Sequence, residues 1–89
     1  MPRVLAEAIA NTLATRESEA ETREAALSAL QLASVHGYNV TQELIGEVCE
    51  HLRSIAEAEQ DEQQRLKILL AERIICEAAE DHRGDGSSN

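Results

Sequence analysis

The chain has 89 residues, no Trp, no Phe and one Tyr, so a single domain must build its core from Ala, Leu, Ile and Val. Its formal net charge of −9 argues against non-specific binding to nucleic acid, which needs Lys and Arg to displace the counterions of phosphates. The same charge makes contact with an anionic membrane surface unfavourable.

The sequence carries no pattern of export or of membrane insertion. Its first 13 residues have neither a continuous apolar core nor a small-residue cleavage site. No run approaches the roughly 18 consecutive apolar residues of a membrane-spanning helix. We therefore expect a cytoplasmic protein that binds neither membranes nor nucleic acid directly.

The periodic signal is helical throughout, and it predicts an all-α fold. Val, Ile and Thr residues nowhere alternate with polar residues as they would in a strand. Pro2 suits the first turn of a helix, and the apolar residues up to Leu13 recur at three- and four-residue spacing. Ser18 and Glu21 then have the spacing of a capping box. The first helical arm either runs straight through this point or breaks and restarts near Ser18.

The clearest boundary lies between residues 36 and 41. Gly37 suits the left-handed residue that closes a helix, and Tyr38 can pack back on the last turn. Asn39 or Thr41 can cap the next helix. Because short connections make their flanking helices antiparallel neighbours, we predict a helical hairpin that turns at Gly37, Tyr38, Asn39 and Thr41.

The second arm is one long helical pattern from Thr41 to about His82. Folding the chain about residues 38 and 39 sets its polar middle, 57–65, opposite the polar stretch of the first arm. Like charges repel at that level, so the two long helices become four if the second arm also breaks, near Gln60. We expect one helical domain over 1–83 and a disordered tail over 84–89.

An apolar arc on the second arm, residues 66–79, covers half of the helix circumference or more. The Ala-rich first arm cannot cover all of it, so we predict that two hairpins assemble as a homodimeric bundle or that the surplus meets a foreign partner. The best candidates for this partner or dimer interface are the large aliphatic residues of the arc, which are Leu66, Leu69, Leu70, Ile74 and Ile75.

No motif indicates catalysis, a cofactor or a bound metal. The 17 acidic residues fall mainly on predicted solvent faces. The Glu-x-x-His motif of di-iron bundles is missing before each of the 3 histidines, and so are the C-x-x-C and H-x-x-x-H spacings of zinc sites. Cys49 and Cys76 are too few for a disulfide framework, and we expect both to be free packing residues.

These observations predict an interaction module and no enzyme. The leading hypothesis is a small acidic helical protein that acts as a regulator, adaptor, chaperone or inhibitor of a partner protein, for which a basic surface would be complementary. The alternative is an acidic mimic of nucleic acid that blocks the basic groove of a nucleic-acid-binding protein. The two hypotheses differ in the surface that matters, which is an apolar stripe in the first and an acidic stripe in the second.

Overall fold

The fold was described from a computed structural model, which covers the backbone of residues 2–87 and the side chains of residues 2–80. Within this part of the chain the protein is all-helical and has no strand, so the predicted fold class is confirmed. Both predicted arms are broken, and the helices are α1 (Pro2–Leu13), α2 (Glu19–Val35), α3 (Gln42–Ala58) and α4 (Glu62–Ser87).

The break between α1 and α2 is fixed by the capping box at Ser18. The Ser18 hydroxyl accepts a hydrogen bond from the Glu21 N–H at 3.1 Å. The Glu21 carboxylate accepts in return from the N–H groups of Glu17 and Ser18, at 2.9 and 3.3 Å. These backbone donors, Glu17 first, hold the pKa of Glu21 below its ordinary value. The N–H groups of Glu17, Ser18 and Glu21 are thereby satisfied, which favours a restart at this residue.

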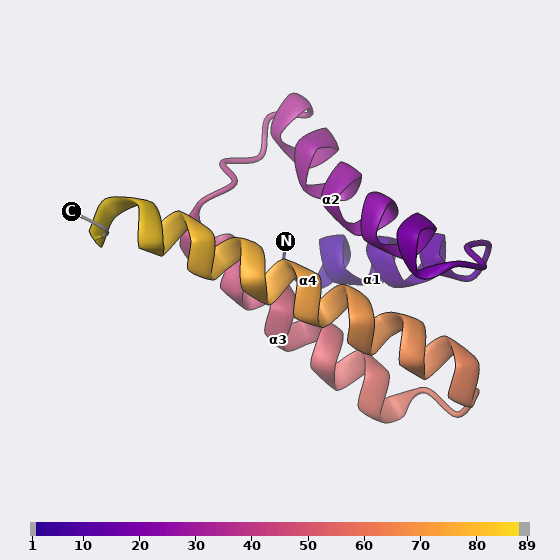
Figure 1. Cartoon of the computed structure of the whole chain (residues 1–89). Helices are drawn as coiled ribbons and strands as arrows, with labels where there is room; N and C mark the ends of the chain where they lie inside the picture. The colour runs from indigo at the N-terminus through magenta and orange to yellow at the C-terminus, as the bar shows by residue number, and fades with distance from the viewer. Residues whose placement is uncertain (1, 88–89) are drawn as a thin grey trace.

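The break between α3 and α4 uses the same chemistry with other residues. The Asp61 carboxylate accepts a hydrogen bond from the Gln64 N–H at 2.9 Å, and the Glu59 carboxylate accepts from the Asp61 N–H at 3.0 Å. Only residues 59–61 separate the two helices, so α3 and α4 become antiparallel neighbours (Figure 1).

The predicted end of α2 at Gly37 is confirmed. Gly37 has a φ of 95°, and its N–H donates to the Ser34 carbonyl at 3.1 Å. The Tyr38 N–H donates to the Ala33 carbonyl at 3.0 Å, which completes a Schellman motif. Thr41 caps α3, because its hydroxyl accepts from the Leu44 N–H at 3.1 Å.

The predicted hairpin about residues 38 and 39 is not formed, however. Among the described residues α2 makes no contact with α3, although the two helices flank this connection. The chain forms two other hairpins, α1–α2 and α3–α4, and they pack with α1 against α3 and α2 against α4 (Figure 1). The polar stretches that would have repelled each other between two long arms become the turns at 14–18 and 59–61, where water solvates them.

The four helices enclose an aliphatic core within one chain. The largest fully buried side chains come mainly from α1, α3 and α4, whereas α2 contributes mostly Ala. The six large aliphatic groups among them are Ile9, Leu13, Ile45, Leu52, Ile68 and Ile75. None of the described helices is long and apolar enough to cross a membrane. The dimeric assembly stays a prediction.

The predicted division into a domain over 1–83 and a tail over 84–89 also stays a prediction. The backbone of α4 is helical to Ser87. Residues 88 and 89, and all side chains after Glu80, lie outside the described part of the structure.

Candidate functional site

An apolar groove runs between α1 and α2. Its main hollow has a volume of about 510 Å³ and is lined by both helices and the connection that follows α2. No Asp, Glu, Lys or Arg takes part in this lining, which consists of Val4, Leu5, Ala8, Ile9, Thr12, Ala29, Leu32, Ala33, His36 and Tyr38. A surface free of carboxylates is notable in a chain with 17 acidic residues.

The rim of this groove carries large apolar side chains that the protein does not cover. Val4 is 58% exposed, Leu32 is 56% exposed and Tyr38 is 39% exposed. Val35, near the same end of α2, is 73% exposed. Ala8, Ala29 and Ala33 line the hollow with single methyl groups, so the larger side chains stand above it. Contiguous exposed apolar surface of this kind usually marks an interaction site.

The groove continues toward the turn between α1 and α2. A second hollow of about 180 Å³ shares Thr12, Ala29 and Leu32 with the first. Its lining adds Arg16 and Glu24, so this end of the groove is charged. An apolar channel with a cationic and an anionic side chain at one end offers both burial and polar contacts to a ligand.

The five residues predicted as an interface do not lie on one surface. Ile74 and Ile75 are 5% and 0% exposed, because the wide arc of α4 packs against both α3 and α2. Leu70 is half-buried, whereas Leu66 and Leu69 are 58% and 37% exposed. The interface role of this set stays a prediction, and only the last two residues offer freely accessible surface for it.

Leu66 and Leu70 lie beside the start of α2. With Lys67 they line a hollow of about 320 Å³, whose other side is formed by Glu17, Ser18, Glu19 and Thr22. This second apolar patch is therefore bordered by carboxylates, unlike the main hollow of the groove between α1 and α2.

The sequence contained a partial signal for the groove. The spacing rule placed Val4, Leu5, Ala8, Ile9 and Leu13 on one stripe of α1. The structure buries Ile9 and Leu13 of this stripe, together with Ala6 and Ala10. The core side of α1 is thus rotated toward Ala6 and Ala10, which leaves Val4 outside. When the apolar stripe of a helix is wider than one neighbouring helix can cover, part of the stripe stays exposed, and the sequence indicates this in advance.

Among the turn residues, Gly37 ends α2 and Thr41 caps α3. Tyr38 lines the groove. Asn39 accepts a hydrogen bond at its carbonyl from the Thr41 N–H at 2.9 Å. The turn thus connects the groove to the start of α3, where Glu43, Glu47 and Glu50 line an acidic hollow of about 600 Å³.

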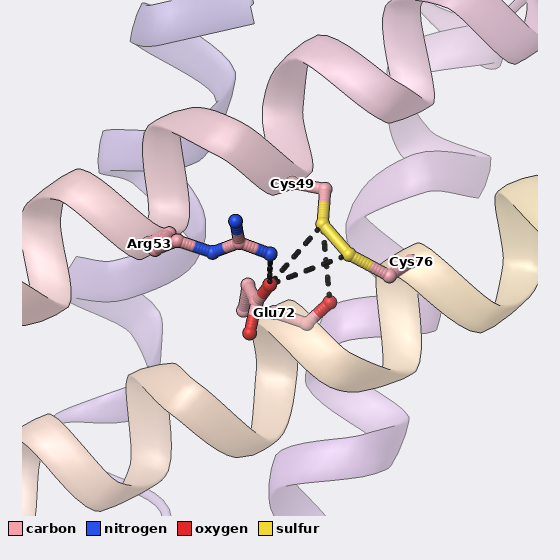
Figure 2. The surroundings of a disulfide bond; sticks show 4 residues. All are labelled: Cys49, Arg53, Glu72 and Cys76. Carbon is pink, nitrogen blue, oxygen red and sulfur yellow. Dashed lines mark hydrogen bonds and ion pairs between the residues drawn. A yellow bond between two sulfur atoms is a disulfide. The ribbon is translucent and has the colours of Figure 1, made fainter.

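A disulfide joins α3 to α4 (Figure 2). Cys49 and Cys76 have Cα atoms 5.6 Å apart, within the range that a disulfide spans. The expectation that both cysteines are free packing residues is therefore wrong. The error follows from the misplaced hairpin, because folding about residues 38 and 39 keeps the two cysteines apart. Folding about residues 59–61 brings them together, and that was the signal available in the sequence.

A carboxylate and a guanidinium accompany the two sulfur atoms (Figure 2). Glu72 Oε2 lies 3.4 Å from Cys49 Sγ and 3.4 Å from Cys76 Sγ. Arg53 Nη2 donates a hydrogen bond to the same oxygen at 2.9 Å, and this bond raises the pKa of Arg53 above its ordinary value. The Glu72 side chain is 13% exposed and the Arg53 side chain 60%, so the guanidinium covers the cluster from the solvent side.

No family model matches the chain, and neither a curated protein nor a solved structure matches it.

Proposed function

We propose that this protein is an interaction module whose groove between α1 and α2 binds the apolar face of a helix from a partner protein. The observation that carries the proposal is the exposed, carboxylate-free apolar lining of the main hollow of this groove in a chain of net charge −9. A regulator, adaptor, chaperone or inhibitor would work in this way, by burying an apolar stripe of its target.

The dimensions of the groove suit a short helix. α1 has 12 residues and is therefore about 18 Å long, which corresponds to roughly three turns of a bound helix. Such a helix would present apolar residues at positions i, i+3 or i+4, and i+7 to the groove. Its polar face would meet a protein of net charge −9, so a basic amphipathic helix is the expected partner, and its approach would be accelerated by charge attraction.

Affinity purification from the native cell tests the proposal, with the parent chain and two matched double variants as bait. Val4→Glu, Leu32→Glu places two charges on the groove rim, at exposed positions that do not belong to the core. Leu66→Glu, Leu69→Glu makes the same change in charge on α4, also at exposed positions, and Leu66 belongs to the second apolar patch. We expect the groove variant to lose a partner that both the parent and the other variant retain, with helicity unchanged by circular dichroism.

The opposite pattern would contradict the groove and support the α4 surface predicted from the sequence. Retention of every partner by both variants would refute both apolar surfaces. A mimic of nucleic acid would then be the better account.

The acidic hollow on α3 is the observation that favours this second candidate function. Glu43, Glu47 and Glu50 are all exposed there, and the first two are one helical turn apart. Changing all three to Gln should abolish capture of a nucleic-acid-binding protein if mimicry is the function, and should leave a groove-bound partner in place.

A further inference from the structure

Three side chains with the ligand atoms of a metal site converge between α3 and α4. The sulfur atoms of Cys49 and Cys76 and a carboxylate oxygen of Glu72 all lie within 4.8 Å of one another. We propose that these three residues, once the disulfide is reduced, form a binding site for one thiophilic divalent cation of the zinc class. This site is separate from the groove between α1 and α2, and the proposal does not depend on the function of that groove.

The position of the carboxylate carries the argument. Glu72 Oε2 is 3.4 Å from each sulfur atom. A tetrahedral zinc ion, with Zn–S near 2.3 Å and Zn–O near 2.0 Å, holds its sulfur and oxygen ligands about 3.5 Å apart. The carboxylate oxygen is therefore already about as far from each sulfur atom as a shared zinc ion would hold it.

The main change that the site needs is a wider separation of the two sulfur atoms. In a tetrahedral zinc site two sulfur ligands lie about 3.8 Å apart. The helices hold the two Cα atoms at 5.6 Å, and rotation about the Cα–Cβ bonds separates the sulfurs without moving the backbone. The site needs no change in the packing of α3 against α4.

The chemistry of the donor set selects the class of ion. Two thiolates favour zinc or cadmium over magnesium and calcium, which prefer oxygen ligands. Two thiolates and the Glu72 carboxylate carry three negative charges, and the divalent ion together with the Arg53 guanidinium neutralises them. This balance matters because Cys49 is 5% exposed and the Glu72 side chain 13% exposed, and an unbalanced charge is costly at such positions.

Arg53 also orients the carboxylate. Its guanidinium donates to Glu72 Oε2 at 2.9 Å from the neighbouring helix, as the outer partners of metal-binding groups do. Three protein ligands leave the fourth position of a tetrahedral ion to a water molecule.

Binding of the ion to the two thiols needs no oxidant or reductant. When the ion binds, each thiol loses one proton to the solvent and forms one sulfur–metal bond, and no electron is transferred. In the experiment a phosphine opens the disulfide. The disulfide takes up two electrons and two protons, while the phosphine becomes its oxide with oxygen from water.

The test uses the full chain, reduced with a phosphine, freed of reductant without oxygen and titrated with Zn²⁺ or Co²⁺. We expect one ion per chain by calorimetry and a thiolate-to-cobalt absorption band. We expect no binding at this site by the oxidised protein. Glu72→Gln should weaken binding at least tenfold, and Cys76→Ser should remove most of the absorption band. Glu77→Gln, on the same helix but paired with Arg73, is the matched control and should bind like the parent.

A rise in the melting temperature with Zn²⁺ is expected for the reduced parent but not for Cys76→Ser. This second readout keeps the test decisive even where reduction loosens the fold. The proposal is overturned if the reduced chain does not bind, if one ion bridges two chains, or if Glu72→Gln and Glu77→Gln bind alike.

Discussion

Gly37 is the residue on which the end of α2 depends. Its φ is +95°, and nothing lies within 4 Å of the position that a Cβ atom would take, so a side chain there would meet backbone strain and no clash. Gly37→Val should lower the free energy of unfolding by about 1–2 kcal/mol, because L-residues resist the left-handed conformation. Urea unfolding followed by circular dichroism measures the change.

Gly46 provides the control for this prediction. It lies inside α3 at a helical position, and a Cβ there would also meet nothing within 4 Å. Gly46→Ala should therefore raise the free energy of unfolding by about 0.5–1 kcal/mol. If both substitutions changed the free energy of unfolding in the same direction and by the same amount, the positive φ of Gly37 would not be the reason that glycine is needed there.

At the scale of elements, the pairing of α3 with α4 is the strongest link in the molecule. These helices pack most extensively, and the disulfide between Cys49 and Cys76 spans 27 positions of sequence. The ion pair of Arg53 with Glu72, 2.9 Å between nitrogen and oxygen, joins the same helices. By contrast, α2 rests on α1 and α4 without reaching α3, so its packing is the first that we expect to loosen.

Reduction of the disulfide should destabilise the protein. A crosslink that closes a loop of this length lowers the conformational entropy of the unfolded chain. On the chain-entropy model this raises the free energy of unfolding by about 3–4 kcal/mol. When a reductant and a metal chelator are added, we expect the free energy of unfolding to fall by this amount and the midpoint of urea unfolding to shift to a lower urea concentration. Cys76→Ser should already unfold at the lower midpoint and should not respond to the reductant. A reductant-independent midpoint in the parent would contradict the link.

At the scale of the whole molecule, the question is whether the chain assembles with itself. Because a single chain already encloses a core, the case for the predicted homodimer now rests on the exposed apolar groove and patch. Two copies of net charge −9 repel each other, and salt screens this repulsion. Sedimentation equilibrium should therefore show association at micromolar concentration that strengthens with ionic strength. A single-chain mass at every concentration and salt level would refute the homodimer.

The sequence by itself located the end of α2 and the capping residues Ser18 and Thr41, although it left open whether the chain breaks at Ser18. Ser18 with Glu21, Gly37 with Tyr38, and Thr41 act through hydrogen bonds to residues at most five positions away. Such contacts form in the same way whatever the rest of the chain does, so spacing alone predicts them. The buried stripe of α3 was predictable for the same reason, since one helix face has a fixed period.

Only the tertiary structure decided which helices meet. Ala-rich faces fit several neighbours almost equally well, so the pairing depends on the burial summed over the whole chain and on where charge can be solvated. That choice turned the polar stretches into loops, joined Cys49 to Cys76, and buried Ile74 and Ile75 while it left Leu66 outside. It also created the groove beside Val4 and Leu32, because the break at residues 14–18 folds α1 and α2 into a hairpin of their own.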